Sequence, residues 1–295
     1  MNAPTLRFLT YNIKAGRFHP DGLEAVARCI EAMAPDIVAL QEVDRGAARS
    51  EGVDQPTWLG ERLGLGSAFG CSFILPDGGE YGNALLSRWP ISAVETVALP
   101  QPADDAQPWV RWLRPGLRPI RESERAWRLA GQLGIASALR RFYPWREPRT
   151  ILRATVATPG ASLAVLVTHW GLQAAERAAQ AEATLAAITG VRGPLVLAGD
   201  FNAEPDSAEI QHLRTRLVDV AHTVGLTGEA RLTFPSGPTG ARTADGWAEA
   251  IDYVFTRGLA PVVVGVIADT TRASDHQPLL AELRLAHDED SDHRG

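Results

Sequence analysis

The chain lacks several features that would place it in a special class of protein. It has only two cysteines in 295 residues, Cys29 and Cys71, which excludes a disulfide framework and a cluster of thiolate metal ligands. No apolar run approaches the roughly 20 residues of a membrane-spanning helix, and the N-terminus has no basic segment followed by a long apolar stretch. These absences predict a globular, cytoplasmic protein without a signal peptide.

An excess of positive charge is also missing from the chain as a whole. The net charge is −6 and the pI is about 5.7, which excludes a surface that is basic all over but not a local basic patch. Residues 101–153 form such a patch by composition, because they hold eleven arginines against five acidic residues and also half of the eight tryptophans. The last ten residues, 286–295, are polar and acidic and predict a disordered tail.

Short apolar runs alternate with helical patterns along the chain. Helical spacing follows Asp21, a candidate N-cap, and returns in the Ala-rich residues 173–189. The apolar runs that predict strands are residues 6–13, 36–43, 81–91 (two pieces around a turn), 162–170, 194–202, 250–258, 262–269 and 278–285. We expect a single α/β domain over residues 1–285, built on mixed β-sheets, with an insert at about 101–148.

Most of these apolar runs end or begin on a polar side chain. A single Asn or Asp beside a strand is more often a turn former or helix cap than a ligand. Their joint occurrence favours one shared site, since strands can hold such groups in a fixed geometry at their ends. The polar residues are Asn12, Glu42, His169, Asp200, Asn202, Asp252, Asp275 and His276.

Carboxylates and amides without thiolates suit a hard cation such as Mg²⁺ or Mn²⁺, with waters and substrate phosphate completing its coordination. Zinc held by two histidines and a carboxylate is the less favoured alternative, because a neighbouring group can act as the orienting partner of each histidine. The chemistry indicated is metal-assisted attack of water on a phosphoester, with a carboxylate positioning the water and imidazoles acting on the phosphate.

Seven motifs in order strongly resemble the endonuclease/exonuclease/phosphatase superfamily. They are "TYNI", "LQEVD", "GNALLSR", "THWGL", "GDFNAEPDS", "IDYVF" and "SDHQP", and they extend from residue 6 to about residue 285, apart from residues 101–148. The resemblance implies a deoxyribonuclease I-like α/β (α+β) sandwich: two packed mixed β-sheets flanked by helices, here with a helical insert. The polar strand ends would then converge at one rim.

The resemblance also implies a role for each polar residue. Glu42 looks like the principal metal ligand, with Asn12 beside it, and Asp275 like a further group of the metal site. Asp200 resembles the carboxylate that orients or deprotonates the attacking water. Asn202 resembles an amide that positions the phosphate.

The two histidines are assigned in the same way. His276 is similar to the family histidine that contacts the scissile phosphate, with Asp252 as its carboxylate partner. His169 resembles a histidine on the leaving-group side of such nucleases and sphingomyelinases. Whether Glu80 is the partner of His169 stays open, because "GGEYGN" is displaced by one residue from the family pattern.

Two polar residues in the predicted helix after "THW" lie three apart and share a face. Arg177 and Gln180 suit either phosphate contact or docking of the helix against the rim, and we favour docking. His19, His212 and His222 belong to no pattern and are interpreted as surface or structural residues.

The arginines and tryptophans of the insert indicate which kinds of substrate are possible. Residues 122–142 predict a helix with tryptophan and aliphatic residues along one side and arginines toward its ends. Such a helix suits an anionic membrane surface, a single-stranded nucleic acid, or simple packing on the domain. The sequence therefore predicts a monomeric metal-dependent phosphoesterase acting on a lipid head group or another small phosphodiester, with a nuclease and, less favoured, a non-catalytic binding module as alternatives.

Overall fold

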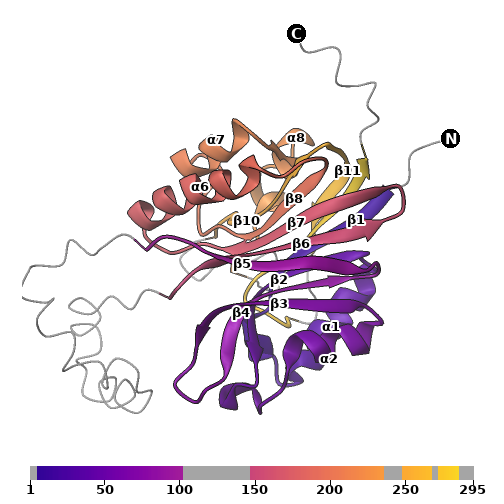
Figure 1. Ribbon diagram of the computed structural model, residues 1–295, viewed down its shortest axis with the longest axis vertical. Helices are drawn as coiled ribbons and strands as arrows, with labels where there is room; N and C mark the ends of the chain where they lie inside the picture. The colour runs from indigo at the N-terminus through magenta and orange to yellow at the C-terminus, as the bar shows by residue number, and fades with distance from the viewer. Residues whose placement is uncertain (1–4, 102–146, 236–247, 268–271, 286–295) are drawn as a thin grey trace, which may run out of the picture.

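The computed structural model describes residues 5–101, 147–235, 248–267 and 272–285, which form two β-sheets packed face to face (Figure 1). The first sheet contains β1 (Thr5–Asn12), β2 (Ile37–Arg45), β3 (Gly66–Ile74), β4 (Glu80–Ser87), β11 (Leu259–Val266) and β12 (Leu279–Leu285). The second contains β5 (Ile91–Ala98), β6 (Thr150–Thr158), β7 (Ala161–His169), β8 (Leu195–Asp200), β9 (Val218–Asp219) and β10 (Asp252–Arg257). The strand orders are β11-β12-β1-β2-β4-β3 and β5-β6-β7-β8-β10-β9.

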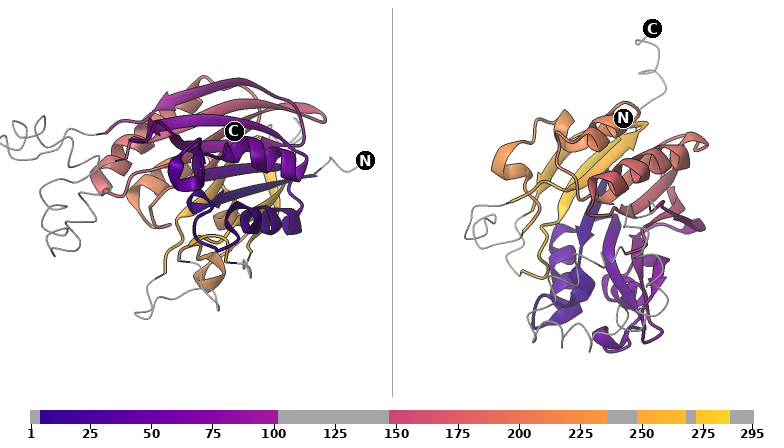
Figure 2. Two further views of the ribbon diagram at one scale, coloured as in Figure 1. Left: turned by 90° about the horizontal axis from the view of Figure 1, so that it is seen from below. Right: turned by 90° about the vertical axis from the view of Figure 1, so that its left-hand side faces the viewer.

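Helices cover the outer face of each sheet. The first sheet carries α1 (Gly22–Met33) and α2 (Gln55–Leu63), and the second carries α6 (Ala174–Thr189) and α7 (Ala208–Arg214). The short α8 (Val220–Thr223) contributes Val220 to the core between the sheets. Figure 2 shows the same layers from two further sides. Three short 3₁₀ helices complete the elements: η1 (Lys14–Gly16), η2 (Ala48–Ser50) and η3 (Gly228–Arg231).

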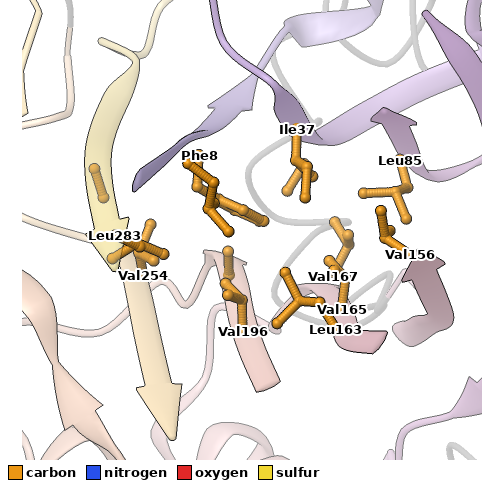
Figure 3. Close-up of a cluster of buried hydrophobic side chains, with 14 of the residues drawn as sticks. Phe8, Ile37, Leu85, Val156, Leu163, Val165, Val167, Val196, Val254 and Leu283 are labelled. Carbon is orange, nitrogen blue, oxygen red and sulfur yellow. The ribbon is translucent and has the colours of Figure 1, made fainter. Parts of the chain in front are cut away.

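The main hydrophobic core lies between the sheets (Figure 3). Phe8, Ile37 and Leu85 of the first sheet face Val167 and Val196 of the second, and all five side chains are fully buried. Two further cores lie under the helices, one between the first sheet and α1 and α2, the other between the second sheet and α6 and α7. A strand that is buried on both faces has a nearly continuous apolar sequence, and this accounts for the apolar runs that predicted strands such as β2 and β8.

Strand direction brings the polar residues to one edge. β1 and β2 are parallel, joined by the crossover helix α1, and β7 and β8 are parallel, joined by α6. The carboxyl ends of these strands therefore lie on the same side of their sheets. β10 and β12 run antiparallel to β8 and β1, so it is their first residues that meet this edge.

The expected sandwich of two mixed sheets flanked by helices is confirmed, and most predicted strands match the observed ones to within a few residues. Asp21 does occupy the N-cap position of α1, but its side chain makes no capping hydrogen bond and instead pairs with Arg28. The sequence patterns did not indicate α2, α7, β3, β6 or the short β9 and α8. The helix expected at residues 122–142 and the tail 286–295 lie outside the described residues. Within the described residues, no helix is both long and apolar enough to cross a membrane.

Candidate active site

Glu42 reaches the site through an irregularity in β2. The pairing of β2 with β4 shifts register between Leu40 and Val43, and Glu42 has a φ of 54°, in the left-handed region that non-glycine residues rarely adopt. A bulge of this kind changes the direction in which a side chain leaves a strand. Such strain is typical of functional positions, and here it aims a carboxylate at the rim.

Asn12, the last residue of β1, connects the two sheets. Its buried side-chain nitrogen donates to Glu42 Oε1 at 3.1 Å and to Asp200 Oδ2 at 3.1 Å. Its backbone carbonyl accepts a hydrogen bond from Ser274 Oγ at 2.6 Å. One amide therefore sets the distance between the carboxylate of the first sheet and that of the second.

Asp200 and Asn202 owe their positions to tight backbone geometry after β8. A Cβ on Gly199, whose φ is +152°, would lie 1.8 Å from the carbonyl oxygen of Thr168, so only glycine fits against β7. Asn202 has a φ of 49°, and its backbone N–H donates to Asp200 Oδ1 at 2.9 Å. Its side-chain nitrogen donates to the carbonyl oxygen of Trp170 at 2.9 Å.

His276 lies between two buried carboxylates. Its Nδ1 is 2.9 Å from Asp252 Oδ2 and its Nε2 is 3.6 Å from Asp200 Oδ2. Burial disfavours the imidazolium, but the charges of Asp252 and Asp200 outweigh it and raise the pKa of His276 to about 10. The ring is therefore a cation at neutral pH. Burial, in turn, raises the pKa of Asp200.

His169, the last residue of β7, contacts the same oxygen of Asp200 from the other side. Its Nε2 is 3.3 Å from Asp200 Oδ2, and its Nδ1 is 2.9 Å from a guanidinium nitrogen of Arg149. Burial, reinforced by the Arg149 charge, lowers the pKa of His169 well below its usual value. No sequence motif indicated Arg149, and the available signal was an arginine directly before the run "TILRATV".

A lysine, also missed, occupies the side of the site where the cation was expected. Lys14 Nζ lies 3.2 Å from Asp275 Oδ2 and 3.8 Å from Glu42 Oε1. Two carboxylates that accept an ammonium ion between them present oxygen ligands suited to a hard cation. A second group that could hold a metal ion consists of Asp200, Asp252 and His276, whose ligand atoms lie within 4.8 Å of one another.

These groups open into a cavity of about 740 Å³. Of the residues predicted for the site, Glu42, His169, Asp200, Asn202 and His276 line this cavity. Asn12 and Asp252 are fully buried behind them, and Asp275 lies beside Lys14. All eight predicted residues therefore meet in one network.

The open question about Glu80 is answered by its contacts. Its carboxylate forms an ion pair with Arg45 on the neighbouring strand, while the Nδ1 of His169 faces Arg149. Register explains the difference, since Glu80 lies opposite Arg45 in the β2–β4 pairing.

The helix that follows His169 docks against the rim, as favoured from the sequence. Gln180 is fully buried, and its side-chain oxygen accepts a hydrogen bond from the backbone N–H of Gly171 at 2.8 Å. Arg177 forms an ion pair with Glu209 at 3.4 Å and donates to the carbonyl oxygen of Leu172 at 2.6 Å. Arg177 also lines the cavity.

The model of the Endonuclease/Exonuclease/phosphatase family matches residues 9–276, which include all eight predicted site residues. The chain belongs to this family. Its members are hydrolases that act on phosphoesters.

Curated relatives are matched over part of their length. A UPF0294 protein of Yersinia pseudotuberculosis is 29% identical over 166 residues, which is 56% of this chain and 53% of the relative. A UPF0294 protein of Vibrio cholerae is 31% identical over 159 residues, 51% of each chain. The chain thus spans about half the length of the curated relatives it matches.

Solved structures of family members share the fold. A family protein of Beutenbergia cavernae is 24% identical, with a TM-score of 0.66 and coverage of 96% of this chain and 72% of that one. A family protein of Bacteroides vulgatus is 18% identical, with a TM-score of 0.65 and coverage of 96% and 99%. TDP2 of D. rerio, complexed with a single-strand DNA product, is 17% identical, with a TM-score of 0.62 and coverage of 95% and 99%. At these identities the likeness concerns the fold.

Proposed function

We propose that this family member is a divalent-metal-dependent phosphoesterase that activates water to cleave a small organic phosphodiester. The observation that carries the proposal is the environment of Asp200 Oδ2. This one buried oxygen lies 3.1 Å from the amide nitrogen of Asn12, 3.3 Å from His169 Nε2 and 3.6 Å from His276 Nε2. A carboxylate surrounded by donors at the edge of a cavity is suited to hold and deprotonate a water molecule.

The donor set fits Mg²⁺ or Mn²⁺. Glu42 and Asp275 supply carboxylate oxygens, Asn12 supplies an amide beside them, and Lys14 already places a positive charge between the two carboxylates. When bound, the cation would offset the negative charge that develops on the phosphoryl group. Glu42 is the expected principal ligand, because its left-handed backbone at the bulge in β2 places its carboxylate in the cavity, 3.8 Å from Lys14 Nζ.

Asp200 acts on the water, and His276 and Asn202 act on the phosphate. The pKa of Asp200 is raised by burial, which makes its carboxylate a stronger base than an exposed aspartate. His276 donates one N–H to Asp252, and its other ring nitrogen lies 3.6 Å from Asp200 Oδ2 in the cavity wall, where its N–H can also bind a phosphoryl oxygen. Asn202 lines the same cavity and can also position the phosphate.

A metal-dependence experiment tests the proposal. Glu42→Gln should retain the fold and lose turnover of bis-p-nitrophenyl phosphate by orders of magnitude, with partial recovery in excess Mn²⁺. The matched control is Glu95→Gln, which removes a carboxylate from an exposed ion pair with Arg153 and should change turnover little. Full activity of the wild-type protein in a strong chelator would contradict the proposal.

The charge of the cavity supports a small substrate over a nucleic acid. Besides the groups already described, its walls carry the carboxylates of Glu176, Glu204 and Glu249, whereas Glu147 is paired with Arg149 and Arg177 with Glu209. Carboxylates along a binding surface repel the phosphates of a polynucleotide. A lipid head group or another small phosphodiester carries a single such charge. Assays with phospholipid vesicles, plasmid DNA and single-stranded RNA under the same conditions compare these substrates directly.

A nuclease is the second candidate, favoured by the composition of residues 101–153, which have eleven arginines against five acidic residues. Glu147, where the described chain resumes after this insert, lines the cavity.

We propose that the insert selects the substrate, by contact with a membrane surface or with nucleic acid, and does not form part of the catalytic centre. Replacing residues 104–143 with a short Gly/Ser linker should preserve hydrolysis of the chromogenic diester and abolish selectivity. A folded deletion variant as inactive as Asp200→Asn would contradict this.

A further inference from the structure

Arg149 is a buried cation for which no role has been assigned. It directly precedes β6, and its backbone carbonyl accepts a hydrogen bond from Leu99 N at 2.8 Å. β6 and β7 are antiparallel with Ile151 opposite Thr168, which brings the residues before β6 beside the end of β7, where His169 lies. Only 7% of Arg149 is exposed, although a free arginine is strongly hydrated. Its burial therefore calls for a specific partner.

The partner is the ring of His169. A guanidinium nitrogen of Arg149 lies 2.9 Å from His169 Nδ1. Guanidinium groups carry only N–H donors and do not lose their proton in proteins, so Nδ1 must accept this hydrogen bond through its lone pair. The single ring proton is then on Nε2, and that nitrogen lies 3.3 Å from Asp200 Oδ2.

We propose that Arg149 is a positioning residue that holds His169 as the neutral Nε2–H tautomer, aimed at Asp200. The tautomer follows from the contacts alone, and only its kinetic consequence rests on the proposed phosphoesterase function. The same guanidinium nitrogen lies 3.1 Å from Glu147 Oε2, which supplies a compensating charge for the buried cation.

The two histidines of the site therefore differ in charge, although both contact one oxygen of Asp200. His276 has a carboxylate, Asp252, at its Nδ1, which stabilises an imidazolium. His169 has a guanidinium at the equivalent nitrogen. If Nδ1 were protonated, two N–H donors would face each other and no hydrogen bond could form. Opposite partners thus separate a charged from a neutral imidazole within one site.

This assignment changes what His169 can do. A neutral ring whose Nδ1 accepts from Arg149 cannot deliver a proton to a leaving group as an imidazolium acid would. It can donate its Nε2–H to Asp200 or to a phosphoryl oxygen.

The experiment reads the tautomer by ¹⁵N NMR of protein with ¹⁵N-labelled histidine, with the His169 signals assigned by comparison with His169→Gln. The wild-type spectrum should show an unprotonated Nδ1 and a protonated Nε2. Arg149→Gln retains a side-chain N–H donor and should keep this tautomer. Arg149→Met has no donor and should shift the ring toward the Nδ1–H form or the imidazolium. The control is Arg153→Met, four residues further along the chain in β6, which loses a surface pair with Glu95 and should leave the spectrum unchanged.

Kinetics provide the second readout. Arg149→Met should lower kcat for the chromogenic diester about 10- to 100-fold, the usual effect of removing a partner that orients a site histidine, with KM little changed.

A wild-type His169 protonated at Nδ1, or an unchanged tautomer in folded Arg149→Met, would overturn the proposal. If Arg149→Met does not fold, the spectra of the wild type and Arg149→Gln decide. A rise in KM at constant kcat would instead make Arg149 a substrate ligand. Absence of all hydrolysis by the wild type would refute the proposed function while the NMR result stands.

Discussion

Asp200 and Asp252 lie directly opposite each other in the antiparallel pairing of β8 and β10, and the ring of His276 spans their side chains. Two buried carboxylates on paired residues of neighbouring strands repel each other unless a cation lies between them. The imidazolium of His276 supplies that charge and joins Asp200 and Asp252 into one unit, in which we propose that Asp200 activates water and His276 binds the phosphate.

Because these groups act together, we expect their losses to be non-additive. Asp200→Asn and His276→Ala should each reduce kcat for a small diester nearly as much as the double variant does, since either change disables the same unit. The measurement is a double-mutant cycle on steady-state kcat, with thermal melts to confirm folding. If the two single losses multiply in the double variant, the residues act independently.

Glu80 should be dispensable for catalysis. Its ion pair with Arg45 lies on the partly exposed surface of the first sheet, and such pairs contribute about 1 kcal/mol or less to stability. Glu80→Gln should therefore leave kcat and KM close to wild type, whereas Asp252→Asn, which removes the partner of His276, should reduce kcat strongly. A loss in Glu80→Gln comparable to that in Asp252→Asn would show that Glu80 serves the site.

Gly199→Ala should prevent stable pairing of β7 and β8. The added methyl group would lie 1.8 Å from the carbonyl oxygen of Thr168, and the φ of +152° is itself unfavourable for alanine. We expect a loss of at least about 3 kcal/mol in the free energy of unfolding, measured by chemical denaturation. Gly190→Ala is the control, because a Cβ there meets nothing within 4 Å. Equal stability of the two variants would contradict the close approach.

Gln180→Leu tests how α6 supports the loop after His169. The substitution leaves the buried N–H of Gly171 without its 2.8 Å acceptor, which should cost about 1–3 kcal/mol of unfolding free energy. Gln211→Leu, at an exposed position where the side chain donates to the carbonyl oxygen of Pro205, should change stability by much less. Indistinguishable denaturation midpoints for the two variants would argue that Gly171 finds another acceptor.

Much of the fold follows from local pattern. Runs such as "IVALQEV" and "LVLAGDFN" are apolar because their strands are buried on both sides, and such runs can be recognised in the sequence alone. The elements α2, α7 and β3 were not predicted because exposed positions interrupt their apolar pattern. β6 was not predicted although it is mostly buried, because threonines and Arg153 interrupt its apolar run.

The sequence by itself determined eight polar residues of the candidate site but not Lys14 or Arg149, because residues such as Asn12, Asp200 and His276 stand at or near the end of a buried strand in a recognisable motif. Only the tertiary structure decided how those residues are paired. The choice of Arg149 over Glu80 as the partner of His169 depends on the register of β6 against β7 and of β2 against β4. The left-handed backbone of Glu42 depends on a bulge in that second pairing. Hydrogen-bond partners are selected by distances of a few ångströms between segments far apart in the chain, and no local pattern of residues encodes those distances.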